Sequence, residues 1–311
     1  MPGAAARLAM TDSNLHRTVE LFAPAKINLF LHVRRRREDG YHDLETWMQK
    51  LDFGDTVGLR LRGDGSLGLD CSDRSLPTDR SNLAWRAAEV FFSASRRGKG
   101  YGVDIWIAKR IPVAAGLGGG SSDAGSVLRG LNRLFGNEFS RTELCAMALR
   151  LGADVPFFVV EDDAVLAEGV GEVMHPVETL KGYGVLLVNP GFSVSTRWVF
   201  ENLGLTSTLK ESKLASFQKD ASELPSLGVL SNDLERVTLA QYPELASIKA
   251  SLLEAGAEIA LMSGSGPTVF GLFPDLSIST VEMQAIALRM KRKFGKMVFV
   301  ARAKSGASPS G

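Results

Sequence analysis

The chain has 311 residues, of which 45% are hydrophobic and 23% are charged, and its formal net charge is +1 at pH 7. This length suits one large domain or two medium ones, and the composition is that of an ordinary globular protein. The nearly balanced charge argues against nucleic acid as a partner, and no apolar run approaches the length needed to span a membrane. Two distant cysteines, Cys71 and Cys145, indicate neither a disulfide framework nor a metal site, so we expect a cytoplasmic protein.

The first half of the chain mixes strand-like and helix-like patterns. Residues 1–19 are interpreted as an N-terminal extension without a secretory signal. Alternating and β-branched runs predict strands at 19–33, 46–53, 56–61 and 103–109, with turns at Gly54-Asp55 and 63–65. Helical spacing of apolar residues predicts helices at 81–96, 122–135 and 140–151. Ser140 and Glu143 form a capping box at the start of the third helix.

The second half continues without regular strand–helix–strand alternation. It predicts strands at 164–168, 184–188, 258–262 and 268–273, helices at 243–254 and 279–294, and a last strand ending at 303. The polar segment 206–227 is expected to be variable surface, and the tail 304–311 to be disordered. This order predicts an α+β protein with two domains, at 20–178 and 179–303, and not a doubly wound sheet.

Residues 112–124 form a glycine-rich turn between a predicted strand and a predicted helix. Four glycines in the five positions 116–120 expose backbone amides, and the helix start adds free N–H groups and the positive end of its dipole. Ser121 and Ser122 are placed to cap the helix or to contact a phosphate. The spacing matches neither the P-loop nor the dinucleotide fingerprint. The turn therefore predicts another kind of phosphate site, the alternative being a turn that only lets a helix pack closely on a strand.

Three more segments carry candidate functional groups. Lys26 and Asn28 lie two residues apart, on one face of a predicted strand. Asp154 follows a predicted helix, where the dipole is least favourable to a carboxylate, which indicates a paired or functional acid. The small-residue segment 262–268 joins two predicted strands and could close on a ligand. Each has a structural alternative, namely a solvent-facing lysine, a helix-terminal turn and a plain β-turn.

Together these segments resemble the GHMP kinases of galactose, homoserine, mevalonate and phosphomevalonate, whose ATP loop has the form Pro-x3-Gly-Leu-x-Gly-Ser-Ser. Residues 24–29 and the downstream Asp-Gly-Tyr-His at 39–42 are similar to one family among them, the 4-diphosphocytidyl-2-C-methyl-D-erythritol kinases. Segments 151–156 and 263–268 match the same family in the same order, so the resemblance covers residues 20–303. It implies a two-domain fold, with an N-terminal domain like ribosomal protein S5 domain 2, a C-terminal ferredoxin-like α/β sandwich, and an active site in the cleft between them.

The resemblance also implies an activity. Such kinases transfer the γ-phosphate of ATP to the 2-hydroxyl of 4-diphosphocytidyl-2-C-methyl-D-erythritol, in the non-mevalonate isoprenoid pathway. Lys26 and Asp154 match the catalytic pair. Asp154 would accept or orient the hydroxyl proton, acting as a base or as an orienting charge, and Lys26 would favour the charged carboxylate and neutralise growing charge. Asn28 would hydrogen-bond the substrate near the reacting hydroxyl.

The remaining matches concern binding. Tyr41 would stack on the cytosine, His42 would bond its polar edge, and Phe200 would cover its other face, although a packed aromatic and a surface histidine are the plain alternatives for the first two. The ATP site would comprise Asn82, Leu83, Lys109, Pro112, Val113, Ala114, Ala115, Gly116, Leu117, Gly118, Gly119, Gly120, Ser121 and Ser122. ATP chemistry implies Mg²⁺, held by Ser121 or Ser122 or by phosphates and water alone, so no metal ligand is assigned. Gly125 stands where alanine is more usual and is expected to loosen the helix start slightly.

Two rival functions remain at this point. One is a related kinase that acts on a different small alcohol, for which a base-stacking tyrosine would have no use. The other is a regulatory ATP-binding protein without turnover, which predicts loss of Lys26 or Asp154, yet both are present. The basic run 34–37 is interpreted as a solvated hairpin end, with steering of an anionic substrate as the alternative. The sequence does not indicate an oligomeric state.

Overall fold

The computed structural model describes residues 17–204, 229–275, 279–295 and 297–305. The predicted variable segment 206–227, most of the predicted N-terminal extension and most of the predicted tail lie outside the described residues. No helix in the described part of the chain is long and apolar enough to cross a lipid bilayer.

The described residues form two sheets and eight helices. The strands are β1 (Thr18–Arg36), β2 (His42–Arg62), β3 (Leu67–Cys71), β4 (Gly102–Ala108), β5 (Ala164–Gly169), β6 (Val173–Pro176), β7 (Tyr183–Val188), β8 (Ile259–Met262), β9 (Val269–Pro274) and β10 (Val298–Arg302). The helices are α1 (Leu83–Ala94), α2 (Gly119–Leu134), α3 (Arg141–Leu149), α4 (Val155–Val159), α5 (Thr196–Glu201), α6 (Glu235–Gln241), α7 (Glu244–Glu254) and α8 (Thr280–Phe294).

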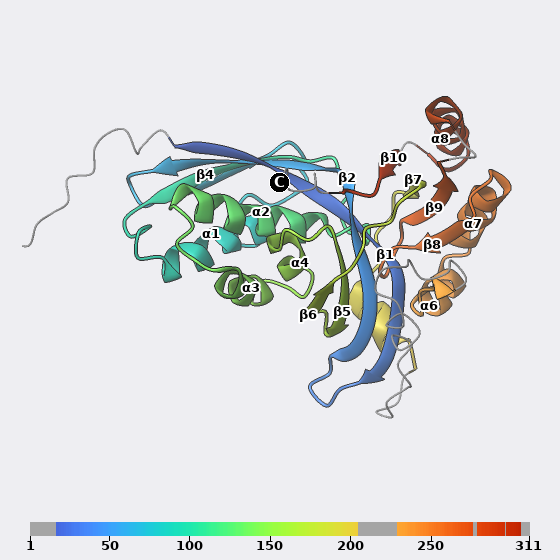
Figure 1. Cartoon of the computed structure of the whole chain (residues 1–311), viewed down its shortest axis with the longest axis horizontal. Helices are drawn as coiled ribbons and strands as arrows, with labels where there is room; N and C mark the ends of the chain where they lie inside the picture. The colour runs from blue at the N-terminus through green and yellow to red at the C-terminus, as the bar shows by residue number, and fades with distance from the viewer. Residues whose placement is uncertain (1–16, 205–228, 276–278, 296, 306–311) are drawn as a thin grey trace, which may run out of the picture.

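The larger sheet is organised around the long antiparallel hairpin of β1 and β2. Its strand order is β3-β4-β2-β5-β6, with β1 paired to β2. Residues 56–62 of β2 pair with β4, and residues 44–49 pair with β5. The hairpin therefore extends well past the helices α1, α2 and α3, and Figure 1 shows its tip curving beyond the rest of the sheet.

The predicted turn at Gly54-Asp55 is wrong, because β2 runs through it without a break. A Cβ on Gly54 would lie 2.3 Å from the carbonyl oxygen of Ala23, so glycine allows β1 to approach closely there. Asp55 is fully buried, and its carboxylate accepts the backbone amides of Arg110 and Ile111 at 2.5 and 2.8 Å. Gly54 thus allows a close contact between strands, and Asp55 provides a buried hydrogen-bond acceptor.

One apolar core lies between the larger sheet and helices α1, α2 and α3. The smaller sheet, in the order β10-β7-β9-β8, packs one face on the β1–β2 hairpin through residues such as Ile27, Leu29, Val185 and Phe270. Its other face packs on α7 and α8. Figure 1 shows this second layer beside the hairpin, opposite the first group of helices. The hairpin is therefore shared by both halves of the molecule, and the predicted α+β class with two sheets is confirmed.

Most predicted elements are present, and five short ones were not predicted. The capping box of Ser140 and Glu143 is confirmed, with both reciprocal hydrogen bonds formed. The elements missed by the sequence patterns are β3, β6, α4, α5 and α6. Each has at most seven residues, too few for an apolar period to be distinguished from chance.

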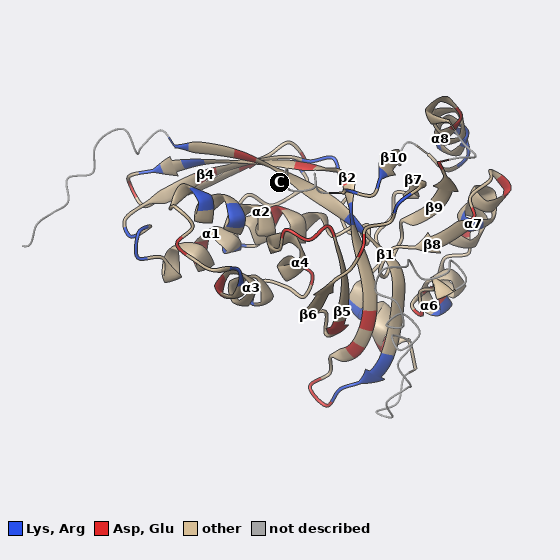
Figure 2. Cartoon of the chain, in the orientation of Figure 1, with Lys and Arg blue, Asp and Glu red and all other residues tan. Residues whose placement is uncertain are grey.

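Charged residues of both signs are interspersed along the ribbon in Figure 2. At the hairpin tip, three of the four arginines of the run 34–37 have carboxylate partners. Arg34 pairs with Glu45, Arg35 with Asp43, and Arg37 with Asp39. The predicted solvated hairpin end therefore consists largely of ion pairs between β1, β2 and the loop that joins them.

Candidate active site

The glycine-rich segment 112–118 forms a loop that leads into the start of α2. Ala114, Gly116 and Gly118 have φ angles of 51°, 76° and 74°, in the left-handed region. Left-handed residues in a turn help to point successive N–H groups to one side, which makes an anion-binding concavity. A left-handed alanine is strained by about 1 kcal/mol, and such strain concentrates at functional sites. The loop thus has the backbone of a phosphate site.

The helix after the loop was predicted to begin at Ser122, but it begins at Gly119. Its N-cap is Gly118, which has no side chain to cap the helix, so the first N–H groups stay free for a ligand. Ser121 lines the cleft, whereas Ser122 is fully buried and its hydroxyl has no hydrogen-bond partner in the described part of the chain. Leu117 is also buried and does not line the cleft. The other predicted loop residues line it.

The loop is held in place by the segment 262–268. A Cβ on Gly116 would lie 2.1 Å from the carbonyl oxygen of Ser263, and the Ser263 hydroxyl donates to the carbonyl of Gly116 at 2.9 Å. A Cβ on Gly264 would lie 3.4 Å from the Asn28 side chain and 3.5 Å from the Lys26 nitrogen. The two small-residue turns therefore meet directly beside Lys26. Only residues without side-chain bulk allow this approach.

Lys26 and Asn28 lie at the centre of the cleft, and both are buried. The Lys26 ammonium donates to Asn28 Oδ1 at 2.5 Å, and Asn28 Nδ2 donates to Thr46 Oγ1 at 2.8 Å. Thr46 donates in turn to the carbonyl of Phe30 at 2.7 Å. This chain of bonds fixes the Asn28 amide so that its oxygen faces Lys26. The predicted adjacency of Lys26 and Asn28 is confirmed, and Thr46 is the orienting partner that sequence reasoning missed.

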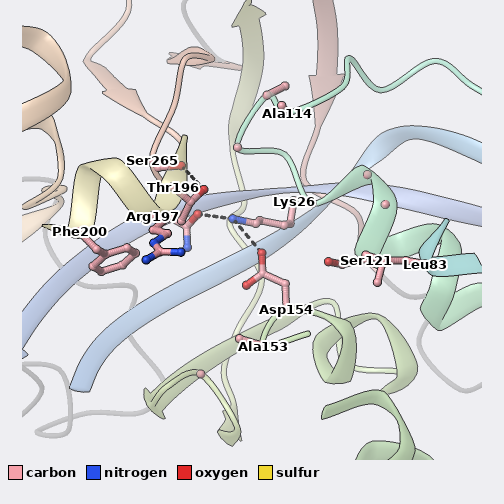
Figure 3. A pocket seen from close by; sticks show the side chains of 18 of the residues that line it. Lys26, Leu83, Ala114, Ser121, Ala153, Asp154, Thr196, Arg197, Phe200 and Ser265 are labelled. Carbon is pink, nitrogen blue, oxygen red and sulfur yellow. Dashed lines mark hydrogen bonds and ion pairs between the residues drawn. The ribbon is translucent and has the colours of Figure 1, made fainter. Parts of the chain in front are cut away.

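The sequence suggested that Asp154 lies at the unfavourable C-terminal end of a helix. This prediction is wrong, because Asp154 is the N-cap of α4. Its carboxylate lies 3.7 Å from the Lys26 ammonium, and its side chain is 43% exposed against 4% for Lys26. A carboxylate at a helix start is favoured by the dipole. A buried cation therefore faces an acid that is open to the cleft, as Figure 3 shows.

The helix that carries Asp154 packs tightly against α2. A Cβ on Gly125 would lie 2.7 Å from the Cβ of Phe158 in α4. Gly125 therefore does more than loosen the helix start, because its missing side chain lets α2 approach α4. Lys50 donates to the carbonyl of Val160 at 2.7 Å, just past the end of α4. These contacts fix the short helix relative to the phosphate loop.

A cleft of about 1060 Å³ runs past Lys26 and Asp154. Figure 3 shows Lys26 and Asp154 in its middle, Ser121 and Leu83 on one side, and Arg197 and Phe200 of α5 on the other. All the predicted substrate residues line it, as do Asn82, Leu83 and Lys109. The volume suits one or two ligands of nucleotide size.

The side of the cleft beyond α5 contains the predicted base pocket. Tyr41 is 63% exposed, at the turn between β1 and β2. The His42 ring stacks on Phe200, with centroids 4.8 Å apart and planes inclined by 29°. Burial lowers the pKa of His42, and the positive charge of Arg36 lowers it further. The Tyr41 ring is thus open to a flat ligand, whereas His42 and Phe200 are half-buried and each covers one face of the other.

On the opposite side of the cleft, two residues that were predicted to bind ATP have structural roles. Asn82 is the N-cap of α1, with its side chain accepting from the amide of Ala84 and donating to the carbonyl of Pro77. The Lys109 ammonium is held by Asp55 at 2.5 Å and by Asp123 at 2.8 Å. Burial lowers the pKa of Lys109, but the two carboxylates raise it overall, while burial raises the pKa of Asp123 to about 7. Leu83 leaves an apolar surface beside them.

Comparison with known proteins decides the family. The models for the N-terminal and C-terminal domains of GHMP kinases match residues 82–162 and 205–295. A 4-diphosphocytidyl-2-C-methyl-D-erythritol kinase of Desulfotalea psychrophila is 45% identical over 297 residues, which cover 95% of this chain and 97% of that protein. The chain belongs to this kinase family. The kinase of the same name from Geobacter metallireducens is 47% identical over 83% of this chain and 90% of its own.

Solved structures agree with this assignment. The crystal structure of a 4-(cytidine 5'-diphospho)-2C-methyl-D-erythritol kinase is 33% identical, covers 93% of this kinase and all of its own chain, and superposes with a TM-score of 0.73. A homoserine kinase from Cytophaga hutchinsonii, 20% identical, covers 96% of this chain and 98% of its own with a TM-score of 0.67, which shows the fold alone. The expected GHMP kinase fold is confirmed.

Sequence reasoning missed several residues of the cleft wall in this kinase. Met48, Thr196 and Arg197 line it without having been singled out, whereas Arg36, Ala153 and Ser265 line it from the segments 34–37, 151–156 and 262–268 that the sequence had marked. The Thr196 hydroxyl lies 2.8 Å from that of Ser265, which links α5 to the segment 262–268. No signal in the sequence marks Thr196 or Arg197, because α5 is short and its position depends on packing against the hairpin.

Proposed function

We propose that the chain transfers the γ-phosphate of ATP to the 2-hydroxyl of 4-diphosphocytidyl-2-C-methyl-D-erythritol, as its family membership implies. The observation that carries the proposal is the placement of Lys26 and Asp154, 3.7 Å apart, between a phosphate loop and an aromatic pocket. ATP would place its phosphates on the amides at the start of α2. The cytidine would occupy the pocket of Tyr41, His42 and Phe200, which leaves the alcohol at the catalytic pair. The product would serve the non-mevalonate isoprenoid pathway.

In this proposal Asp154 holds and accepts the proton of the 2-hydroxyl. The hydroxyl oxygen then forms a bond to the γ-phosphorus as the bond from phosphorus to the β–γ bridging oxygen breaks, and ADP leaves. Lys26 faces both Asp154 and the reaction centre, so its ammonium compensates charge on the attacking oxygen and on the transferred group. The Asn28 amide, oriented by Thr46, keeps the ammonium in that position.

Mg²⁺ would enter as a complex with ATP. Within the described residues no group of three or more His, Cys, Asp or Glu could hold a metal ion. We place the ion mainly on substrate phosphates and water, which is common for Mg²⁺. Ser121, whose hydroxyl lies on the cleft wall at the start of α2, is the residue we place beside it. When bound, the ion neutralises charge on the β- and γ-phosphates.

The proposal is tested by ADP release from Mg·ATP with three alcohols in parallel, namely 4-diphosphocytidyl-2-C-methyl-D-erythritol, mevalonate and homoserine. We expect turnover with the cytidylated alcohol alone. Turnover with one of the others would retain the catalytic pair but reject the cytidine pocket. Bound ATP without any turnover would favour the regulatory alternative.

The Tyr41→Ala variant tests the pocket itself. Stacking of a base on an aromatic ring contributes about 1–3 kcal/mol, so the KM for the cytidylated alcohol should rise roughly tenfold while the KM for ATP changes little. Steady-state kinetics with each substrate varied in turn measures both. Phe22→Ala, which removes a partly exposed ring of β1 outside the cleft, is the matched control. Equal increases of both KM values in Tyr41→Ala would reject the stacking role.

A further inference from the structure

Arg197 lies on the cleft wall between the catalytic pair and the aromatic pocket. It precedes Phe200 by three residues in α5, so the two side chains share one face of this helix. Thr196, the residue before it, is tied to Ser265, whose segment lies beside Lys26. Figure 3 shows Arg197 and Phe200 on the same side of Lys26. Along α5, Arg197 is therefore placed between the reaction centre and the base pocket.

The guanidinium of Arg197 is anchored on one edge and open on the other. Its Nε donates to Oε1 of Glu201, one helical turn away, at 2.8 Å. Among the described residues, no acceptor lies within hydrogen-bond distance of its two terminal nitrogens. The side chain is 87% exposed. Because the five guanidinium donors form a rigid fork, anchoring through Nε aims the terminal nitrogens without using them.

The other cations of the described cleft wall are engaged or lie elsewhere. Lys26 faces Asp154 and Asn28, and Lys109 is held by two buried carboxylates. Arg36 is the cross-strand partner of His42, so it lies at the base pocket and not on the α5 wall between that pocket and Lys26. The stretch between the pocket and the catalytic pair thus presents the positive charge of Arg197.

We propose that Arg197 is a specificity-determining residue that binds the diphosphate of the cytidylated alcohol. The proposal rests on the proposed function, since that substrate carries two phosphates between its base and its alcohol. With the base on Tyr41 and Phe200 and the hydroxyl at Asp154, the diphosphate lies beside α5. Planar guanidinium and phosphate form paired, charge-assisted hydrogen bonds, which a neutral alcohol substrate would not form.

The alternative is an ordinary helix-surface ion pair with Glu201. Such pairs contribute only a few tenths of a kcal/mol to stability and select no ligand. The two readings differ in one measurable quantity, the affinity for CDP relative to that for cytidine. These two ligands share the base and ribose and differ by the diphosphate.

Isothermal titration calorimetry with CDP and with cytidine tests the proposal, with Mg²⁺ and saturating ADP present to fill the nucleotide site. We expect the wild-type protein to bind CDP more tightly than cytidine, and Arg197→Met to lose about tenfold in CDP affinity with cytidine affinity unchanged. The KM for the cytidylated alcohol should rise by a similar factor, with the KM for ATP unchanged. Arg60→Met is the matched control, because Arg60 is also exposed and paired, and its partner Asp104 keeps Arg62.

An unchanged ratio of CDP to cytidine affinity in Arg197→Met would overturn the proposal, as would an equal loss of both affinities, which would indicate a displaced α5. An equal loss of CDP affinity in Arg60→Met would also overturn it, since net charge alone would then explain the effect. These failures leave turnover of the cytidylated alcohol by the wild-type protein intact. Absence of that turnover would instead reject the proposed function, and the role of Arg197 with it.

Discussion

Replacing Asp154 by asparagine should lower kcat by about 10²-fold or more and leave ATP affinity nearly unchanged. The amide keeps the size of the side chain but cannot accept the hydroxyl proton, and it removes the charge that faces Lys26 at 3.7 Å. Asp154 lies at the start of α4, whereas the phosphate loop leads into α2, so the ATP contacts should survive. Steady-state kinetics and calorimetric ATP titration measure the two effects.

Asp70→Asn is the matched control for this experiment. Asp70 is an exposed carboxylate paired with Arg74 four residues away, outside the cleft wall. Its replacement should leave kcat within about twofold of the wild-type value. If Asp154→Asn retains near-normal kcat, Asp154 has no place in the mechanism. A loss confined to the KM for ATP would also contradict the assigned role.

Replacing Gly116 by alanine should disrupt the phosphate loop. At φ 76° any side chain costs about 1–2 kcal/mol, and here the added Cβ would also lie 2.1 Å from the Ser263 carbonyl oxygen. The loop must then separate from the segment 262–268, which positions it beside Lys26. We expect the KM for ATP to rise more than about tenfold and the melting temperature to fall by several degrees.

The Gly182→Ala variant is the control that separates the cost of the backbone angle from the steric clash of the added Cβ. Gly182 has φ 77°, almost the same angle, but an added Cβ would have no atom within 4 Å. This variant should show only the cost of the backbone angle in thermal unfolding, with normal turnover. If Gly116→Ala resembles Gly182→Ala in both the KM for ATP and the melting temperature, the contact between the two turns does not contribute to ATP binding.

Local signals in the sequence predicted much of the fold and of the site. The helix α8 was predicted well, because burial of one face repeats over its 15 residues, whereas the long run 23–33 of the predicted strand β1 is buried on both faces. The phosphate loop was also readable, since glycines with exposed amides before a helix are a local property of the chain. Matching motifs then placed Lys26, Asn28, Tyr41, His42, Phe200 and Asp154, and all of them line one cleft.

The roles of residues that depend on partners distant in the sequence could not be predicted from local patterns. Asp55 looked like a turn residue because its partners, the amides of Arg110 and Ile111, lie on the far side of β4 in the sequence. Asp154 was placed at the wrong end of a helix, because α4 has only five residues and no apolar period. Gly125 showed no reason for lacking a side chain until Phe158 was seen against it.

The sequence by itself determined the class of the fold, the glycine-rich loop before α2 and the chemical groups that line the cleft. Only the tertiary structure decided which groups meet. It buried Lys109 between two carboxylates, oriented Asn28 through Thr46, and placed Arg197 beside the aromatic pocket. The physical reason is that backbone angles and helical periods depend on neighbouring residues, whereas burial, ion pairing and the shape of a cleft depend on segments far apart in the chain.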